Sequence, residues 1–211
     1  RLAHRGAAGS DPETGDGAGI LLQIPDKFMR EAALAVGLEV LPPPGEYAVG
    51  VAFLPQDENE RSLCEVAVAE CVESEGQHFI GWRDVPVDAG AIGVVARDCQ
   101  PMIRHFFVGR GESTIDQETF ERKLFVIRKI VERRVLNADL TETDNFYICS
   151  LSSRLMVYKG LFMAWQVEDF YSDLAHPDMV SAFALVHSRF STNTLGSWKL
   201  AHPYRHIVHN G

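Results

Sequence analysis

The sequence has few cysteines and no long apolar run, and each shortage excludes a class of protein. Four cysteines in 211 residues are too few for a disulfide scaffold, and none forms a C-x-x-C pair of the zinc or thioredoxin type. The longest apolar stretches, such as residues 89–96, fall far short of the roughly 20 residues of a membrane-spanning helix. The sequence therefore predicts four reduced, mostly buried thiols in a cytoplasmic protein without a membrane span.

Positive charge is also in short supply. The chain has 20 Lys and Arg against 29 Asp and Glu, which gives a net charge of −9. A surface of this sign repels phosphate backbones and anionic lipids, so nucleic-acid and membrane-surface binding are not expected. One basic run, without interleaved aromatic residues, fits a solvated helix face better than a nucleic-acid patch; it comprises Arg122, Lys123, Arg128, Lys129, Arg133 and Arg134.

Apolar residues are abundant enough for a buried core. They make up 46% of the chain, and nothing in the sequence argues for more than one domain over residues 1–211. Hydrophobic periodicity predicts strands and helices in a mixed order, which favours an α+β layered fold over a doubly wound parallel sheet. The expected strands are 20–24, 47–54, 79–87, 103–108, 146–151, 155–158 and 183–190, and the expected helices start at Pro25, cover 57–74, follow Thr114 and cover 162–171.

Three local patterns predict how some elements begin or connect. In the helix of residues 57–74, Leu63, Ala67 and Cys71 are expected on the apolar face. Thr114 and Gln117 have capping-box spacing ahead of the long helix, whose apolar stripe is Phe120, Leu124, Ile127 and Val131. Ser152 and Ser153 separate two strand-like segments, which predicts a β-hairpin.

A glycine-rich loop, T-G-D-G-A-G at residues 14–19, superficially resembles a nucleotide-binding motif. It lacks the G-x-G-x-x-G spacing and precedes a predicted strand, so helix N-terminal N–H groups are not available for a phosphate. The loop is therefore expected to need positive φ angles or close backbone approach.

The remaining single-residue candidates are weak. His202, His206 and His209 are spaced like metal ligands, but Pro203 suits a turning chain and no acidic residue or cysteine completes a set, so no metal site is expected. Cys149 lies in an alternating apolar run without an adjacent histidine, which indicates a buried small side chain rather than a nucleophile.

Three short polar stretches are not explained by periodicity: residues 4–7, 187–194 and 209–211. Together they offer a guanidinium group for a carboxylate, several hydroxyl groups, and an amide beside an unhindered glycine N–H. These groups suit an amino-acid-like substrate and an oxyanion hole.

Several longer strings carry a family resemblance. The sequence resembles the class II glutamine amidotransferase domain of the glutamate synthase family, and the likeness covers nearly the whole chain. It rests on H-R-G-A at residues 4–7, T-G-D-G-A-G-I-L-L-Q-I-P at 14–25, G-W-R-D-V-P-V at 81–87, F-Y-I-C-S-L-S-S-R-L-M-V-Y-K-G at 146–160, H-S-R-F-S-T-N-T at 187–194 and H-N-G at 209–211.

The resemblance implies a fold and a reaction. The fold is the four-layer αββα sandwich of N-terminal-nucleophile hydrolases, here incomplete at both ends. In the reaction, an N-terminal cysteine attacks the side-chain amide of L-glutamine with its own α-amine as base. Ammonia leaves, and a thioester is hydrolysed to glutamate. The ammonia then serves the reductive amination of 2-oxoglutarate to L-glutamate, a step of nitrogen assimilation.

The resemblance also assigns residue roles. Arg5 and Gly6 match the Arg-Gly pair beside the nucleophile, Arg189 the clamp on the substrate α-carboxylate, and Thr192 a neighbouring substrate contact. The oxyanion-hole pair is matched by Asn210, through its side-chain amide, and Gly211, through its backbone N–H.

Two parts of the family's machinery are not found in these 211 residues: the N-terminal cysteine and the downstream acid that receives the substrate amine. The segment alone is therefore expected to be inactive. The whole enzyme implied by the resemblance carries FMN and an iron–sulfur cluster outside this segment, and its partners are the rest of the large subunit and a small electron-donating subunit. Two alternatives stay open: a class II amidotransferase that feeds another acceptor, and a silent glutamine-binding or regulatory domain.

Overall fold

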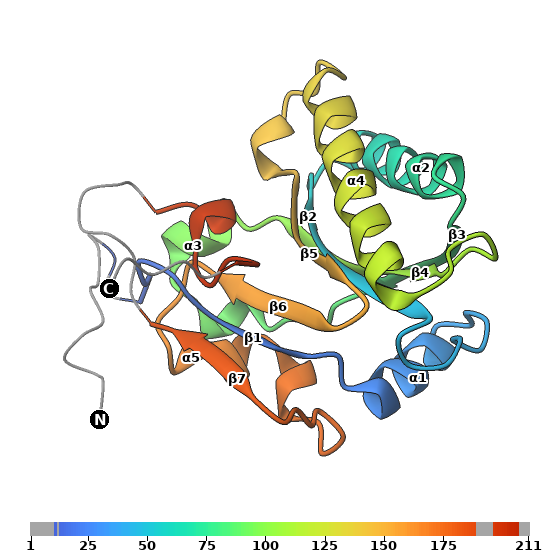
Figure 1. The fold of residues 1–211 in the computed structure, drawn as a ribbon. Helices are drawn as coiled ribbons and strands as arrows, with labels where there is room; N and C mark the ends of the chain where they lie inside the picture. Colours follow the sequence, from blue (N-terminus) through green and yellow to red (C-terminus); the bar gives the residue numbers. More distant parts are fainter. Residues whose placement is uncertain (1–10, 12, 189–195, 207–211) are drawn as a thin grey trace, which may run out of the picture. The chain divides into compact units, whose positions relative to one another are not determined.

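The computed structural model describes residue 11, residues 13–188 and residues 196–206. These residues form an α+β structure with two sheets, one of three strands and one of four (Figure 1). The chain divides into two compact units. The three-stranded unit contains the described parts of residues 1–23, 86–100 and 157–211, and the four-stranded unit contains residues 24–85 and 101–156.

The sheet of the four-stranded unit has the order β3-β4-β2-β5, with antiparallel neighbours. The central strand β2 pairs with β4 along its whole length, from Tyr47 opposite Gly109 to Leu54 opposite Met102. All eight residues of β2 are buried. The strands are β2 (Tyr47–Leu54), β3 (His78–Asp84), β4 (Met102–Gly109) and β5 (Tyr147–Ser152).

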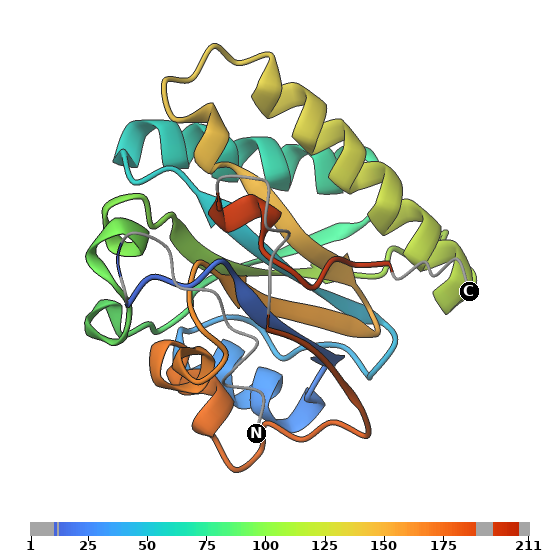
Figure 2. The same ribbon diagram turned by 90° about the vertical axis from the view of Figure 1, so that its left-hand side faces the viewer.

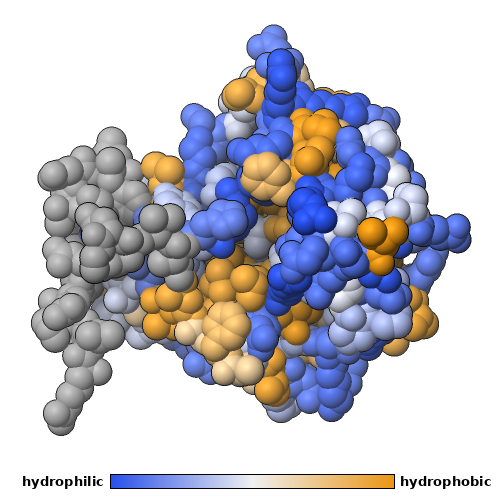
Figure 3. Space-filling model, viewed as in Figure 1, coloured by the Kyte–Doolittle hydropathy of each residue, from blue (hydrophilic) through white to orange (hydrophobic). Residues whose placement is uncertain are grey.

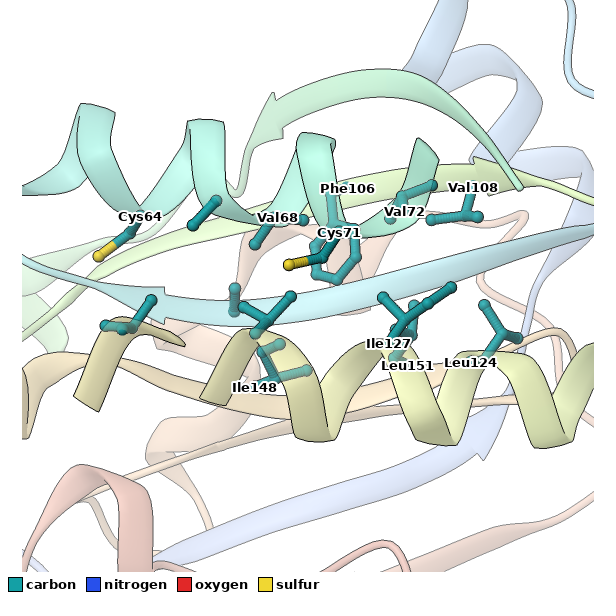
Figure 4. Packing of buried hydrophobic residues seen from close by; sticks show 14 of the residues in the cluster. Cys64, Val68, Cys71, Val72, Phe106, Val108, Leu124, Ile127, Ile148 and Leu151 are labelled. Carbon is teal, nitrogen blue, oxygen red and sulfur yellow. The ribbon is translucent and has the colours of Figure 1, made fainter. Parts of the chain in front are cut away.

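Helices α2 (Glu58–Ser74) and α4 (Gln117–Leu136) lie side by side against one face of this sheet (Figures 1 and 2). The predicted α4 stripe is confirmed, because its four members are completely buried. Figure 4 shows Leu124 and Ile127 of this stripe on the side of the cluster that faces Cys71 and Val72 of α2. In α2 the predicted apolar face is wrong by one position: Leu63 is 58% exposed, and Cys64 is buried instead.

The start of α4 differs from the predicted capping box. Asp116 is the N-cap, and its carboxylate accepts a hydrogen bond from the Thr119 N–H at 2.7 Å. This bond lowers the pKa of the Asp116 carboxyl. Thr114 is buried two residues earlier, where its hydroxyl accepts from Gln77 Nε2 at 2.9 Å. The capping prediction for Thr114 and Gln117 was wrong because aspartate at the nearer position satisfies the helix N–H group.

Helix α1 (Asp26–Ala35) begins after Pro25, as predicted. The carboxylate of its first residue, Asp26, accepts a hydrogen bond from the buried Tyr47 hydroxyl at 3.0 Å. The same carboxylate forms an ion pair with Arg30 at 3.0 Å. The Arg30 guanidinium also donates to the carbonyls of Leu41 and Pro42. These bonds fix the proline-rich connector between α1 and β2.

The three-stranded unit has the strand order β6-β1-β7, and β1 and β7 are antiparallel. Helix α5 is shorter than the predicted 162–171 segment. Around it, Phe162, Phe170, Tyr171 and Trp198 pack ring against ring, with centroids 4.8–5.9 Å apart. The elements are β1 (Ala18–Gln23), α3 (Val94–Asp98), β6 (Leu155–Gly160), α5 (Gln166–Phe170), β7 (Ala184–His187) and the 3-10 turns η2 (Ala89–Ala91), η4 (Ser172–Ala175) and η5 (Trp198–Leu200).

The predicted hairpin around Ser152 and Ser153 does not form, because β5 and β6 belong to different sheets. The Glu121 carboxylate of α4 binds this short connection. It accepts from the Ser153 N–H and hydroxyl, both at 2.6 Å, and from the Ser152 hydroxyl at 3.1 Å. A helix side chain therefore holds the two serines where a hairpin turn was expected.

On the face shown in Figure 3, hydrophilic and apolar residues of the described part of the chain are interspersed. Most of the predicted basic helix face is neutralised locally: Lys123 pairs with Glu75, Lys129 with Glu132, and Arg134 with Glu70. Arg128 departs from the expected solvated face, because it is 5% exposed and bonded to Glu132. Among the described residues, no helix is long and apolar enough to cross a membrane.

Candidate functional site

The six residues that the resemblance assigns to the site lie outside the described part of the chain: Arg5, Gly6, Arg189, Thr192, Asn210 and Gly211. The structure therefore does not test whether they converge. It does describe the segments next to them in sequence, namely the glycine-rich loop, the end of β7, and residues 196–206. All three segments belong to the three-stranded unit.

The glycine-rich loop behaves as predicted, through both positive φ and close backbone approach. Gly17 has φ of +129°. A Cβ on Gly15 would lie 2.3 Å from the backbone carbon of Phe162, and one on Gly19 would lie 2.5 Å from the Tyr158 carbonyl oxygen and 2.8 Å from that of His202. Strand β1 follows directly at Ala18, so the loop packs against other backbone segments and opens no helix for a phosphate.

Side-chain hydrogen bonds fix the start of this loop. The Asp11 carboxylate accepts from the Thr14 hydroxyl at 2.7 Å and from the Glu13 N–H at 3.0 Å, and these bonds lower the pKa of Asp11. The Thr14 hydroxyl in turn accepts from the Ala96 N–H of α3 at 3.3 Å. The loop is thus bonded to the short helix α3.

A second anchor for the loop is Gln166, which is buried at the start of α5. Its amide nitrogen donates to the carbonyls of Glu13 at 3.0 Å and Ala91 at 2.9 Å, and its amide oxygen accepts from the Met163 N–H at 2.8 Å. One side chain therefore joins three separate segments of the three-stranded unit.

The three flanking segments meet at the paired ends of β1 and β7. Gly19 lies opposite His187 in the register of the two strands. The His187 ring packs on the His202 ring with centroids 4.7 Å apart and an interplanar angle of 31°. The loop after Arg5 and Gly6, the strand before Arg189, and the segment before Asn210 are therefore in contact through Gly19, His187 and His202.

The ring contact continues from His202 to Tyr204, with centroids 4.2 Å apart, and from Tyr204 to the Lys159 ammonium, which lies 4.9 Å from the ring centroid. We call these four residues the Lys159–His187 stack. Lys159 comes from β6 and is 1% exposed.

Electrostatics keep the imidazoles of this stack neutral. Burial lowers the pKa of His187 and of His202, and the nearby His187 and Lys159 lower the pKa of His202 further. The Nε2 atom of His187 is buried and has no hydrogen-bond partner among the described residues. Neutral rings pack against each other without charge repulsion, so the stack forms in the state that its surroundings favour.

Comparisons with known proteins assign the whole chain to a family. A family model for class-II glutamine amidotransferases matches residues 1–211. The chain belongs to this family. It is also 51% identical over 211 residues to the glutamate synthase [NADPH] large chain of Bacillus subtilis and 39% identical over 209 residues to that of Azospirillum brasilense.

A plant relative of this amidotransferase domain is similar over the same length. The chain is 38% identical over 210 residues to the chloroplastic ferredoxin-dependent glutamate synthase of Oryza sativa subsp. japonica. The matches cover 99–100% of the chain but 13% of each of these three relatives. The chain therefore spans about an eighth of the length of these glutamate synthases.

The four cysteines of this amidotransferase domain are free, and three of them are buried. Cys64, Cys71 and Cys149 are buried free thiols, which confirms the prediction for Cys149. Burial raises the pKa of the Cys64 thiol to about 12. Cys99 is exposed, but partial burial of its thiol also raises its pKa. A thiol with a raised pKa holds little thiolate at neutral pH, so none of the pKa shifts found here favours attack.

Sequence reasoning overlooked Lys159 and Tyr204 in this amidotransferase domain. The signal for Lys159 was a lysine inside an otherwise apolar strand, L-M-V-Y-K-G, since lysine is almost never fully buried without a partner. His187 was within a stretch identified as a candidate, but its ring contact with His202 depends on the fold. The described residues include no group of three or more His, Cys, Asp or Glu side chains that could hold a metal ion.

Proposed function

We propose that this chain is the glutaminase part of a glutamate synthase, which releases ammonia from L-glutamine for the reductive amination of 2-oxoglutarate to L-glutamate. The observation that carries the proposal is the match over the whole chain to glutamate synthases, at 51% identity in the Bacillus subtilis case. Membership of the wider class-II family alone would not indicate which molecule accepts the ammonia. The remainder of a longer large chain, and a small electron-donating subunit, are the proposed partners.

The proposed reaction has two steps. A cysteine thiolate at the mature N-terminus, outside these residues, attacks the side-chain amide carbon of glutamine, and ammonia leaves after protonation. Water then hydrolyses the thioester to glutamate and restores the thiol. The raised pKa of the Cys64 thiol and the burial of Cys71 and Cys149 support a nucleophile outside this segment.

Within this chain we propose that Arg189 binds the substrate α-carboxylate, with Thr192 beside it, and that Arg5 and Gly6 support the nucleophile. A guanidinium group suits this role because its planar fork binds a carboxylate through two parallel hydrogen bonds. Asn210 and Gly211 would donate hydrogen bonds to the oxyanion. Support comes from the contact among Gly19, His187 and His202, each in a segment next to one of these groups.

We further propose the four-layer αββα sandwich of the N-terminal-nucleophile hydrolases, over a domain that extends beyond residues 1–211. Support comes from two sheets and from the two helices against one face of the four-stranded sheet. An iron–sulfur cluster does not fit the described residues, which offer no cluster of cysteines. We place this cluster and the FMN elsewhere in the longer protein, and we propose a cytoplasmic location.

The test uses the full-length polypeptide that carries these residues, assayed for glutamate formation from 2-oxoglutarate with glutamine or ammonia as nitrogen donor. Asn210→Ala should lower glutamine-dependent kcat by about 10²–10³ with little change in KM, because the oxyanion exists only in the transition state. Arg189→Lys should raise KM for glutamine, because lysine cannot bind the carboxylate as a planar fork. Both variants should keep ammonia-dependent activity.

Three outcomes would contradict the proposal. Glutamine hydrolysis without use of 2-oxoglutarate would indicate another ammonia acceptor. Glutamine binding without hydrolysis would indicate a silent domain. Robust hydrolysis by residues 1–211 alone would show that the nucleophile lies within this segment.

A further inference from the structure

Lys159 is a buried cation with two contacts to one segment. Its side chain leaves the apolar strand β6 and is 1% exposed. Its ammonium donates a hydrogen bond to the Lys199 carbonyl at 2.8 Å and lies 4.9 Å from the centre of the Tyr204 ring. The ammonium therefore contacts residues 199–204 near both ends of that segment.

The same segment is connected to β7 through the Lys159–His187 stack. Between the two contacts of Lys159, the His202 ring packs against both Tyr204 and His187. The Tyr204 hydroxyl also donates to the Leu200 carbonyl at 2.9 Å, which closes the segment on itself. One buried ammonium thus supports two segments, the end of β7 and residues 199–204.

Both segments lead within a few residues to the proposed substrate groups. His187 is two residues before Arg189, and Tyr204 is six residues before Asn210. We propose that Lys159 is a positioning residue for glutamine hydrolysis, which acts by fixing the end of β7 and residues 199–204, the described segments that precede the proposed substrate groups in sequence. This inference rests on the proposed glutaminase function.

A purely structural role for Lys159 and a positioning role predict different results when the lysine is replaced. Removing an ammonium from water is costly. Replacing a buried charge by an apolar side chain of similar shape is often neutral or stabilising. A purely structural role therefore predicts that Lys159→Met, which keeps most of the aliphatic stem, leaves stability and catalysis unchanged or raises stability.

A positioning role predicts a different result. Oxyanion donors act on the transition state, so a small displacement of the segment should reduce kcat more than it affects substrate binding. In the full-length protein, Lys159→Met should lower glutamine-dependent kcat by at least about 10-fold. KM for glutamine should stay within about threefold, and ammonia-dependent activity should not change.

Three further variants complete the experiment. Lys159→Arg keeps the charge and a donor, so it should recover part of the lost turnover. Tyr204→Leu removes the ring beneath the ammonium and should reproduce the loss, which provides a second route if Lys159→Met folds poorly. The control is Lys129→Met, because the Lys129 side chain is 56% exposed on α4; it should behave as wild type.

Wild-type glutamine turnover in both Lys159→Met and Tyr204→Leu would overturn the positioning role. So would equal losses of glutamine- and ammonia-dependent activity together with a lowered Tm, which would indicate a general folding defect. If the wild-type protein itself uses ammonia but does not hydrolyse glutamine, the proposed function fails, and the role of Lys159 fails with it.

Discussion

At the scale of single residues, Gly19 is the position where the glycine-rich loop has least room. A Cβ there would lie 2.5 Å from the Tyr158 carbonyl oxygen, 2.6 Å from the Lys159 Cβ and 2.8 Å from the His202 carbonyl oxygen. Because two of these atoms are backbone, Gly19→Ala should lower the free energy of unfolding by about 3 kcal/mol. Chemical denaturation followed by circular dichroism measures this change.

Gly109→Ala is the matched control for that substitution. A Cβ on Gly109, at the end of β4, would meet its nearest atom, the His78 Cβ, at an ordinary 3.5 Å. The free energy of unfolding of this variant should lie within about 0.5 kcal/mol of the wild-type value. Equal effects of the two alanines would show that close approach does not explain the glycine at position 19.

Residue types alone indicated some buried groups and not others. Cys149 was predicted as a buried side chain from its alternating strand, and it is 1% exposed. Lys159 was not identified, because a lysine in a strand normally indicates an exposed position. Its burial depends on the Lys199 carbonyl and the Tyr204 ring, which lie 40 or more residues away in sequence.

At the scale of elements, Glu121 is the residue that fixes the connection from β5 to β6. Its carboxylate accepts from the N–H and hydroxyl of Ser153 and from the hydroxyl of Ser152. Glu121→Ala leaves these part-buried donors without their acceptor, so the free energy of unfolding should fall by about 1–3 kcal/mol. Thermal and urea unfolding report the change.

Glu118, one turn earlier on α4, provides the comparison. Its side chain is 64% exposed and pairs with Arg154 at the surface. Since exposed ion pairs contribute little, Glu118→Ala should change the free energy of unfolding by less than about 1 kcal/mol. If Glu118→Ala were the more damaging substitution, the assignment of Glu121 as the anchor would be wrong.

The predictions of strands and helices were correct where the hydrophobic periodicity was strong. The predicted strand 47–54 coincides with β2, and the four predicted apolar residues of α4 are completely buried. The errors occurred where a distant partner decides the local structure. The hairpin prediction failed because the acceptor for Ser153 is on α4, and the capping box failed because Thr114 bonds to Gln77 instead.

At the scale of the whole molecule, acid should destabilise the fold through two histidines. The folded-state pKa values of His187 and His202 are lowered, by burial and, for His202, also by the facing groups His187 and Lys159. The unfolded chain therefore binds these protons more readily than the folded chain. Stability should be full above the ordinary histidine pKa near 6.5 and should fall as the pH is lowered below it.

Tm measured at pH values from about 7.5 to 5.5 tests this. His202→Phe keeps a ring in the stack but cannot be protonated, so its Tm should fall less steeply over that range. The control His78→Gln alters a histidine side chain that is 57% exposed and should retain the wild-type slope. An unchanged slope in His202→Phe would exclude the stack as the acid-sensitive element.

The predicted site residues illustrate a different limit of sequence reasoning. Their roles came from motif resemblance, and Arg5, Arg189 and Asn210 lie outside the described residues, so they stay predictions. What the sequence could not indicate is how the neighbouring segments are supported. The ring contact between His187 and His202 depends on where the fold places the end of β7.

The order of strands also determines when each sheet can form as the ribosome makes the chain. All strands of the four-stranded sheet have been synthesised by residue 152, whereas β1 must wait for β6 at residues 155–160 and β7 at residues 184–187. At roughly 5–20 residues per second, the interval between the synthesis of β1 and that of β6 is on the order of ten seconds. During that interval the apolar segment A-G-I-L-L-Q has been made but neither of its neighbouring strands has.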